Sequence, residues 1–257
     1  MTARPVWSEA LRHHWDETAS SRWISTLDGF EALFGKALLW AVEVPGRVCI
    51  LGDHSDYVPY LRANIITFAS DNQRMRALVS PRDDGRVRIA SSLDGCELTE
   101  FDIQEERYDG DWLDGLDERG APDSHWSNYV RGAVAYTQFQ NELGFGFDMF
   151  VDSTIPPASG SSSSSALTLC SLIATHLSNG LTWDRENLAR MGGSAEWYVG
   201  TRGGMMDHAT MVYAEVGSML NLQFRPFEAT SIPHLPSEFC WYSKFTHPAD
   251  KGGPMLA

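Results

Sequence analysis

The sequence has a shortage of positive charge. Its 257 residues contain 20 lysines and arginines against 34 aspartates and glutamates, which gives a formal net charge of −14. Such a chain repels the phosphates of nucleic acids and of anionic membranes, so we expect no nucleic acid and no membrane as a partner. A site that binds a polyanion must therefore attract it through a local group of positive charges or N–H donors, against the negative charge of the whole chain.

Long apolar runs and paired cysteines are absent as well. The most apolar stretch, residues 37–44, is interrupted by Glu43 and is far shorter than the ~20 residues of a membrane-spanning helix. The first 23 residues lack the apolar region of a signal peptide. The four cysteines are widely spaced without a CxxC pair, and three lie in apolar surroundings that are typical of buried thiols. These absences predict a soluble protein of the reducing cytoplasm.

Apolar residues, in contrast, are plentiful enough to form a core. Hydrophobic residues make up 43% and aromatic residues 11% of the chain, which excludes a disordered protein. Strand patterns occur over residues 38–44, 47–51, 63–70, 74–80, 86–91 and 145–154. One helix is expected to begin at Ser8, and a helix is expected to end near Gly35. Further helix patterns cover residues 126–144, 166–177 and the segment after Asp184. The mixture predicts an α+β fold in which antiparallel strands pack against helices.

Turn residues predict how some of these elements connect. The turn at residues 81–85 indicates a hairpin between the strands on either side of it, and a second hairpin is expected for residues 210–215 and 218–224. The acidic segment 104–124 is expected to be a surface excursion. After Pro226 the periodic spacing of apolar residues becomes weak, and no further helix or strand is predicted at the end of the chain.

A loop of glycine and serine stands between a predicted strand and a predicted apolar helix. It reads GSSSSSA from Gly160 to Ala166 and follows two prolines that end the strand. A small-residue loop at a helix N-terminus offers free N–H groups and the positive end of the helix dipole, which together bind phosphate. A flexible linker is the alternative, but the flanking strand and helix favour a phosphate-binding loop. No GxxxxGK[ST] motif occurs, so the loop is not of the Walker type.

A second cluster follows a short apolar strand in the segment PGRVCILGDHSDY. The strand ends at Gly52 and presents Asp53, His54 and Asp56 within four residues. Two carboxylates and an imidazole suit the adjacent hydroxyls of a polyol, but they also suit a metal site or an acidic turn. Spacing alone does not separate these three interpretations.

A third cluster lies in the segment GGMMDH. Asp207 follows paired glycines, where it could serve as a turn or cap residue or as a functional carboxylate. Glu196 lies 11 residues earlier on a predicted helix and offers a second carboxylate for a metal.

These segments together resemble the GHMP kinase superfamily, and galactokinases in particular. PGRVCILGDHSDY resembles the galactokinase signature GRVNLIGEHTDY, and IPPASGSSSSSAL resembles the glycine- and serine-rich phosphate loop of the superfamily. GGMMDHATMVYAEVGSMLNL is similar to the galactokinase segment that begins GIMDQ, and HWSNYVRG is similar to the WANYVKG helix of that family. The four matches occur in the family's order over roughly residues 40–222.

The resemblance implies an activity, which is the ATP- and Mg²⁺-dependent phosphorylation of a monosaccharide at its anomeric hydroxyl to give a sugar 1-phosphate. Its small-molecule partners would be the sugar and ATP. A non-catalytic ATP- and sugar-binding sensor, or a GHMP kinase with a non-sugar alcohol as acceptor, are the alternatives. The presence of Arg47, Asp207 and Glu196 together favours an enzyme over a sensor, and the GDHSDY segment favours a sugar over another alcohol.

The resemblance also implies a domain organisation. Residues 1–223 would form the N-terminal ATP- and sugar-binding domain, and residues 224–257 the beginning of a truncated C-terminal domain, because no third glycine-rich motif follows Phe224. Truncation predicts weak nucleotide binding, poor turnover, and self-association through the incomplete C-terminal side.

Individual roles follow from the positions that match the family. Asp207 would accept the proton of the sugar hydroxyl, and Arg47 would stabilise both that carboxylate and the transferred phosphoryl group. The sugar would be held by Asp53, His54, Asp56 and Gly204. ATP would be bound by Ser159, Gly160, Ser161, Ser162, Ser163, Ser164 and Ser165, with Trp126 and Tyr129 near the adenine. Mg²⁺ would be held by Ser164, with Ser163 as the close alternative, and by Glu196.

Three departures from the family pattern concern the substrate. Asp53 replaces the family's glutamate and is one methylene shorter, Val58-Pro59-Tyr60 replaces two small residues, and Ser161 stands where leucine is usual. These changes leave the identity of the sugar open. Asp53 would repel a substrate carboxylate, so a neutral sugar is expected over a uronic acid.

Overall fold

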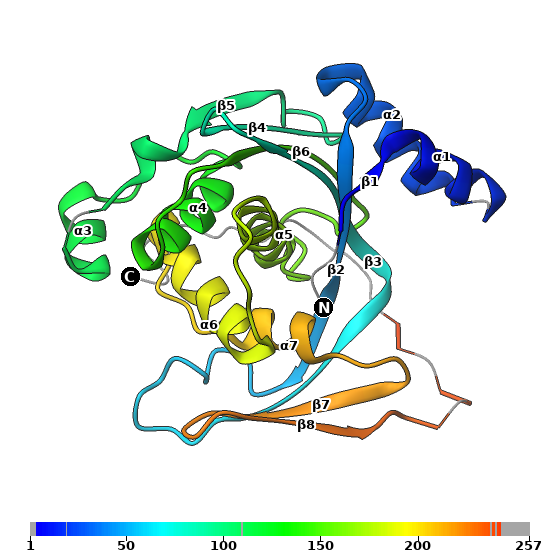
Figure 1. Ribbon diagram of the computed structural model, residues 1–257. Helices are drawn as coiled ribbons and strands as arrows, with labels where there is room; N and C mark the ends of the chain where they lie inside the picture. Colours follow the sequence, from blue (N-terminus) through cyan, green and yellow to red (C-terminus); the bar gives the residue numbers. More distant parts are fainter. Residues whose placement is uncertain (1–3, 19, 109, 237, 240, 243–257) are drawn as a thin grey trace.

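The computed structural model describes residues 4–18, 20–108, 110–236, 238–239 and 241–242 (Figure 1). Its frame is a curved, eight-stranded sheet in the order β1-β2-β3-β6-β4-β5, with β7 paired to β3 and β8 paired to β7. The strands are β1 (Val6–Trp7), β2 (Leu38–Leu51), β3 (Asn64–Arg82), β4 (Arg86–Ser91), β5 (Thr99–Asp102), β6 (Gly146–Ser153), β7 (Ser218–Gln223) and β8 (Glu228–Pro233). The pairing of β4 with β6 is parallel and the others are antiparallel, so the predicted α+β class with a mixed sheet is confirmed.

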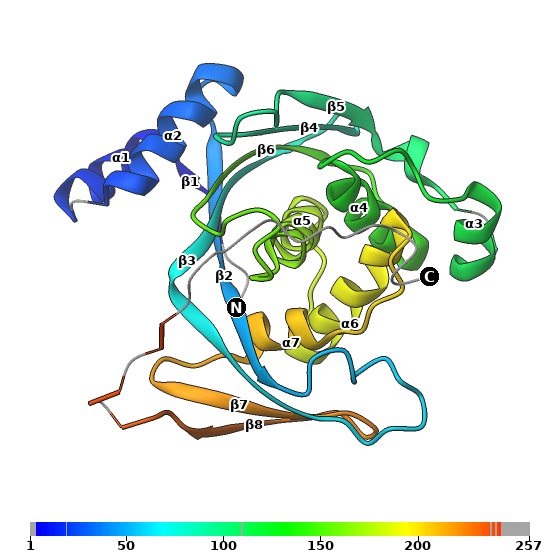
Figure 2. The ribbon, with the colours of Figure 1, turned by 180° about the vertical axis from the view of Figure 1, so that it is seen from behind.

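The helices lie on both faces of this sheet. They are α1 (Ser8–Glu17), α2 (Ser21–Phe34), α3 (Trp112–Arg119), α4 (Asn128–Gln140), α5 (Ser163–Ser178), α6 (Arg185–Glu196) and α7 (Met206–Tyr213), with 3₁₀ turns at Ile103–Glu106 and Trp197–Val199. Helices α4 to α7 fill the concave face, whereas α1 and α2 cover the outside of β3 and β6, as Figure 2 shows from behind. The predicted helices after Ser8, up to Gly35, and after Asp184 are confirmed.

Helix α5 occupies the centre of the concave face. Leu169, Cys170 and Leu172 on this helix are almost fully buried, and α5 contacts α4, α6, β2 and β3. A helix that is apolar on nearly all sides must be covered on all sides. The core therefore fixes the axis of α5, and with it the direction in which the loop before Ser163 points.

Two long strands replace the four short ones expected near the second cluster. Residues 38–44 and 47–51 join into β2, and residues 63–70 and 74–80 join into β3, because the two strands pair with each other on both sides of each gap. The register shifts between Pro45 and Arg47, where residues 70–73 of β3 stand opposite a single residue of β2, which marks a bulge in β3. Bulges increase the local twist of the paired strands, and Arg47 is the first residue of β2 that pairs after this one.

Both predicted hairpins are wrong. Strand β6 lies between β3 and β4, pairing antiparallel with β3 and parallel with β4, so the turn at residues 81–85 joins strands that are not neighbours. All eight residues of β6 are buried, and this strand takes the place between β3 and β4. Residues 206–213 form helix α7 instead of a strand, and β7 pairs with β3 and β8. Strand β8 is an element that the weak pattern after Pro226 did not predict.

Other expectations also need correction. The acidic segment 104–124 contains α3, whose Trp112 and Leu116 are buried, because its apolar side packs on α4 and the turn that follows α6. Of the cysteines, Cys170 is buried but Cys49 and Cys96 are half-buried, and Cys240 lies outside the described residues. No helix in the described part of the chain combines the length and the apolar character needed to cross a membrane.

Candidate active site

Arg47 and Asp207 form a two-point ion pair at the centre of the candidate site. Nε of Arg47 donates to Oδ1 of Asp207 at 2.6 Å, and Nη2 donates to Oδ2 at 2.9 Å. Arg47 comes from β2, directly after the residue opposite the β3 bulge, and Asp207 is the second residue of α7. A planar guanidinium matches a carboxylate in this geometry, which fixes the orientation of both groups.

The serine loop, residues 159–165, packs against this ion pair. Nη1 of Arg47 donates to the carbonyl of Gly160 at 2.5 Å, and the hydroxyl of Ser162 donates to Oδ2 of Asp207. The hydroxyl of Ser165 lies 3.5 Å from the same oxygen. Ser162 adopts a φ of +57°, a left-handed conformation that is costly for serine and that directs its side chain toward Asp207.

Opposing effects act on the carboxyl of Asp207. Burial by itself raises the pKa of this group, but the Arg47 guanidinium and the Ser162 hydroxyl together outweigh burial and lower the pKa below its ordinary value. Asp207 is therefore ionised at neutral pH. About a quarter of its side chain (24%) remains exposed, so a ligand can reach the carboxylate.

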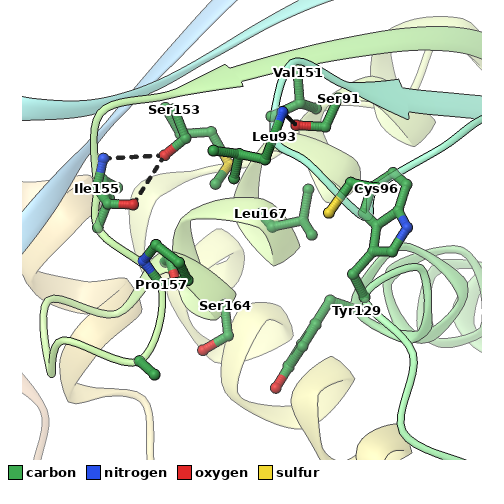
Figure 3. Close-up of a pocket in the computed structure, with 14 residues that line it drawn as sticks. Ser91, Leu93, Cys96, Tyr129, Val151, Ser153, Ile155, Pro157, Ser164 and Leu167 are labelled. Atoms are coloured by element: carbon green, nitrogen blue, oxygen red, sulfur yellow. Dashed lines mark hydrogen bonds between the residues drawn. The ribbon is translucent and has the colours of Figure 1, made fainter. Parts of the chain in front are cut away.

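A pocket of about 300 Å³ opens beside the N-terminus of α5 (Figure 3). It is lined by Met75, Ser91, Leu93, Cys96, Trp126, Tyr129, Val151, Ser153, Ile155, Pro157, Ala158, Ser163, Ser164 and Leu167. Figure 3 shows the hydroxyls of Ser164 and Tyr129 at one end and Leu93 and Cys96 at the other. A mostly apolar pocket beside a helix N-terminus suits a flat ring system that carries phosphates.

The residues predicted for ATP divide into two groups in the structure. Trp126, Tyr129, Ser163 and Ser164 line the pocket. The others are engaged elsewhere: Ser159 donates to the carbonyl of Pro156, Gly160 and Ser161 accept from Arg47 through their carbonyls, and Ser162 and Ser165 face Asp207. Sequence reasoning missed the pocket residues contributed by β3, β4 and β6, because no local motif marks side chains that a sheet brings together.

The carboxylate of Glu196 lies near this pocket. Its Oε1 is buried and has no hydrogen-bond partner among the described residues. Burial raises the pKa of Tyr129, the charge of Glu196 adds to this shift, and a hydrogen bond with Ser164 opposes it. Glu196 and Ser164 therefore both act on the hydroxyl of Tyr129, which lines the pocket.

The donors at this position fit a magnesium ion. A carboxylate and a hydroxyl are the hard oxygen ligands that Mg²⁺ prefers, and Mg²⁺ commonly uses one or two protein carboxylates together with substrate phosphates. No group of three or more histidine, cysteine, aspartate or glutamate side chains in the described part of the chain could hold a metal by itself. The remaining ligands would have to come from a bound nucleotide and water.

The residues predicted for the sugar differ in exposure. Asp53 and His54 are exposed on the loop after β2, where the backbone N–H of His54 donates to Asp53. Asp56 is buried, and its Oδ2 accepts from the backbone N–H of Met206 at 2.9 Å, which caps the first turn of α7. Burial raises the pKa of Asp56 although that N–H opposes the shift. Gly204 lies directly against Asp56.

Known proteins are similar to this chain in sequence and in fold. Residues 128–215 match the family described as GHMP kinases N terminal domain. A galactokinase of Lactobacillus helveticus is 28% identical over 191 residues, which are 74% of this chain and 46% of that protein. The crystal structure of Lactococcus lactis galactokinase complexed with galactose is similar with a TM-score of 0.68 and 24% identity, covering 80% of this chain and 50% of that one.

A D-glycero-D-manno-heptose 1-phosphate kinase from Bacteriodes thetaiotaomicron shares the fold with a TM-score of 0.58 at 16% identity, over 78% of this chain and 61% of that one. The chain thus spans about half the length of the galactokinases that it matches. The predicted resemblance to the GHMP kinase superfamily, and to galactokinases within it, is confirmed.

Proposed function

We propose that this chain carries the phosphoryl-transfer site of a sugar kinase that uses Mg·ATP and phosphorylates a neutral monosaccharide at its anomeric hydroxyl. The observation that carries the proposal is the Arg47–Asp207 ion pair, held against the serine loop at the N-terminus of α5. An ionised carboxylate fixed beside a helix N-terminus that can bind phosphate suits phosphoryl transfer to an alcohol.

Asp207 is the group that would accept the proton of the sugar hydroxyl. Its lowered pKa keeps it ionised, so it can accept a hydrogen bond from the hydroxyl and hold the attacking oxygen in line with the phosphate. Arg47 orients the carboxylate through two hydrogen bonds and places positive charge next to the reacting oxygen. Catalysis of this kind consists mainly of positioning and charge stabilisation.

The nucleotide would lie in the 300 Å³ pocket with its adenine near Trp126 and Tyr129 and its phosphates over the serine loop. Ser164 and Glu196 would hold Mg²⁺, which supplies positive charge to the phosphate oxygens. Free N–H groups at the start of α5 supply the rest of the attraction. This local arrangement is how a chain with a net charge of −14 could bind a polyanion.

The sugar would be bound on the side of Asp207 that faces the loop after β2. Asp53 and His54 are exposed there, so hydroxyl groups of a sugar can reach them. The similarity to a galactokinase structure complexed with galactose supports a sugar as acceptor. The negative charge of Asp53 favours a neutral sugar over a uronic acid.

A screen for ADP release tests this proposal. Mg·ATP is offered with galactose, glucose, arabinose, heptoses, glucuronate or galacturonate, and the product of an active sugar is examined by phosphorus NMR for an anomeric phosphate. We expect release with a neutral sugar and its loss in Asp207→Asn. A mutant as active as wild type would refute the role of Asp207. Ligand binding that stabilises the fold without any ADP release would favour the sensor alternative.

A further inference from the structure

His208 is a buried histidine without a hydrogen-bond partner. It follows Asp207 on α7, its exposed fraction is 0%, and neither ring nitrogen has a hydrogen-bond partner among the described residues. A buried polar group normally finds a partner, because burial without one is costly. Its Nε2 lies 3.6 Å from Oε1 of Glu196, which is buried and unpartnered as well.

Helix α6 is shaped to admit this imidazole. Gly192 and Glu196 are four residues apart on α6, so they share one face of the helix. A Cβ at Gly192 would lie 2.3 Å from Cδ2 of His208, closer than real atoms approach. Glycine is unfavourable inside a helix unless packing requires it. Here it lets the ring of His208 lie against the backbone and reach Glu196 one turn further on.

The two unpartnered groups are complementary. A neutral imidazole with its proton on Nε2 can donate a hydrogen bond, and a carboxylate oxygen can accept one. The observed 3.6 Å is a few tenths of an ångström beyond hydrogen-bonding distance, so a small rotation of the carboxylate completes the contact. Because Oε1 would then be engaged by His208, Oε2 would be the oxygen left for a metal. Carboxylates that bind metals are usually held by such a neighbour.

We propose that His208 is a positioning residue for the metal-binding carboxylate: it donates from Nε2 to Oε1 of Glu196 and turns Oε2 toward the Mg²⁺ of the nucleotide complex. The proposal rests on the function proposed above, since it assumes that Glu196 meets Mg·ATP. His208 itself contacts neither the sugar nor the phosphates.

Nucleotide binding with and without metal separates this role from a purely structural one. The dissociation constant of the non-hydrolysable analogue AMPPNP is measured by titration calorimetry in Mg²⁺ and in EDTA. For wild type we expect tighter binding in Mg²⁺. We call the ratio of the dissociation constant in EDTA to that in Mg²⁺ the gain from Mg²⁺. In His208→Leu this gain should fall about tenfold, which is the lower end of the effect of losing such a neighbour, while the dissociation constant in EDTA stays unchanged. His208→Gln should retain the gain, because its amide can donate to Glu196.

Further variants test whether the loss of the gain from Mg²⁺ comes from misfolding, and they show how large a complete loss would be. Gly192→Ala leaves the histidine in place but displaces its ring, so it should lose the gain from Mg²⁺ as His208→Leu does, with thermal unfolding as a check of the fold. Glu196→Gln gives the value expected when the metal carboxylate is absent. His176→Gln is the matched control, because His176 is also a buried helical histidine but contacts Leu172 and Trp183 instead of the site.

The outcomes distinguish the two proposals. If Glu196→Gln loses the gain from Mg²⁺ but His208→Leu keeps it, the positioning role is refuted and the proposed function stands. If His208→Gln is as impaired as His208→Leu, the side chain acts through its shape and the hydrogen bond is refuted. If wild type binds AMPPNP equally well in Mg²⁺ and in EDTA, the metal role of Glu196 fails and the role of His208 fails with it.

Discussion

Gly204 lies so close to Asp56 that a Cβ on the glycine would stand 1.9 Å from Oδ2 of the carboxylate. The same oxygen accepts the hydrogen bond from the backbone N–H of Met206 that caps α7. One carboxylate therefore links the loop after β2 to the helix that carries Asp207. The absence of a side chain at residue 204 is a condition of that link.

Gly204→Ala should consequently loosen the start of α7. The methyl group displaces Asp56, the helix loses its cap, and the free energy of unfolding should fall by at least the ~1 kcal/mol that a cap contributes. Gly203→Ala is the control, because a Cβ there meets nothing within 4 Å. Urea unfolding of both variants measures the effect. Equal stability of the two would show that the close approach to Asp56 is not required.

The stability of the protein should depend on the ionisation of Asp207. Its pKa in the folded state is lowered by Arg47 and Ser162 against the effect of burial, so the ionised carboxylate stabilises the fold at every pH above the unfolded pKa of ~3.9. This contribution is lost as the pH falls through the folded pKa. We expect the difference in free energy of unfolding between wild type and Asp207→Asn to be largest near neutral pH and to shrink below pH ~4.

Urea titrations at several pH values measure this difference. Asp83→Asn serves as the control, because it removes an exposed carboxylate from the turn after β3 and should leave the unfolding curve close to that of wild type. A constant difference between wild type and Asp207→Asn across the acidic range would contradict the ion pair as the cause.

Cys96 reports on occupation of the pocket. Its half-buried thiol lines the pocket, and burial raises the pKa of Cys96, so reaction with iodoacetamide should be slow but measurable. Mg·AMPPNP at ten times its Kd fills about 90% of the sites, so alkylation should slow roughly tenfold. Peptide mass spectrometry follows each cysteine separately. Buried Cys170 should remain unmodified, and an unchanged rate at Cys96 would place the nucleotide elsewhere.

Glu106 holds the acidic segment to the core. Its fully buried carboxylate accepts from Arg119 at 2.9 Å, from Arg131 at 2.5 Å and from the hydroxyl of Tyr198 at 2.7 Å. Glu106→Ala leaves two arginines without this partner, and we expect a loss of roughly 3 kcal/mol, the lower end for a broken buried pair, because both guanidiniums are partly exposed. Tyr198→Phe removes one hydrogen bond and should cost about 1 kcal/mol.

Thermal and urea unfolding of these variants measure the loss. The exposed Glu118→Ala on α3 is the control and should change the free energy of unfolding by less than ~0.5 kcal/mol. If Glu106→Ala is no less stable than Glu118→Ala, the buried cluster does not anchor the segment.

The predictions that held rest on signals within one element. Asp184 accepts from the backbone N–H of Asn187 and starts α6, and the apolar run after the serine loop forms α5. The predictions that failed concern which strands pair with each other, or a helix whose first turn is capped by a residue distant in the sequence. Residues 210–215 alternate like a strand, but α7 begins because Asp56, far away in sequence, caps it.

The sequence by itself determined the α+β class, the apolar helix behind the serine loop and the kinds of side chain available for chemistry, since periodicity, capping and composition act over a few residues. Only the tertiary structure decided that β6 separates β3 from β4 and which sheet residues line the pocket. The family resemblance implied that Arg47 acts on Asp207, but only the tertiary structure gives the two hydrogen bonds that join them across 160 residues of chain. It also placed His208 beside Glu196. The reason is physical: these contacts depend on burial of a common core, which no short stretch of the chain contains.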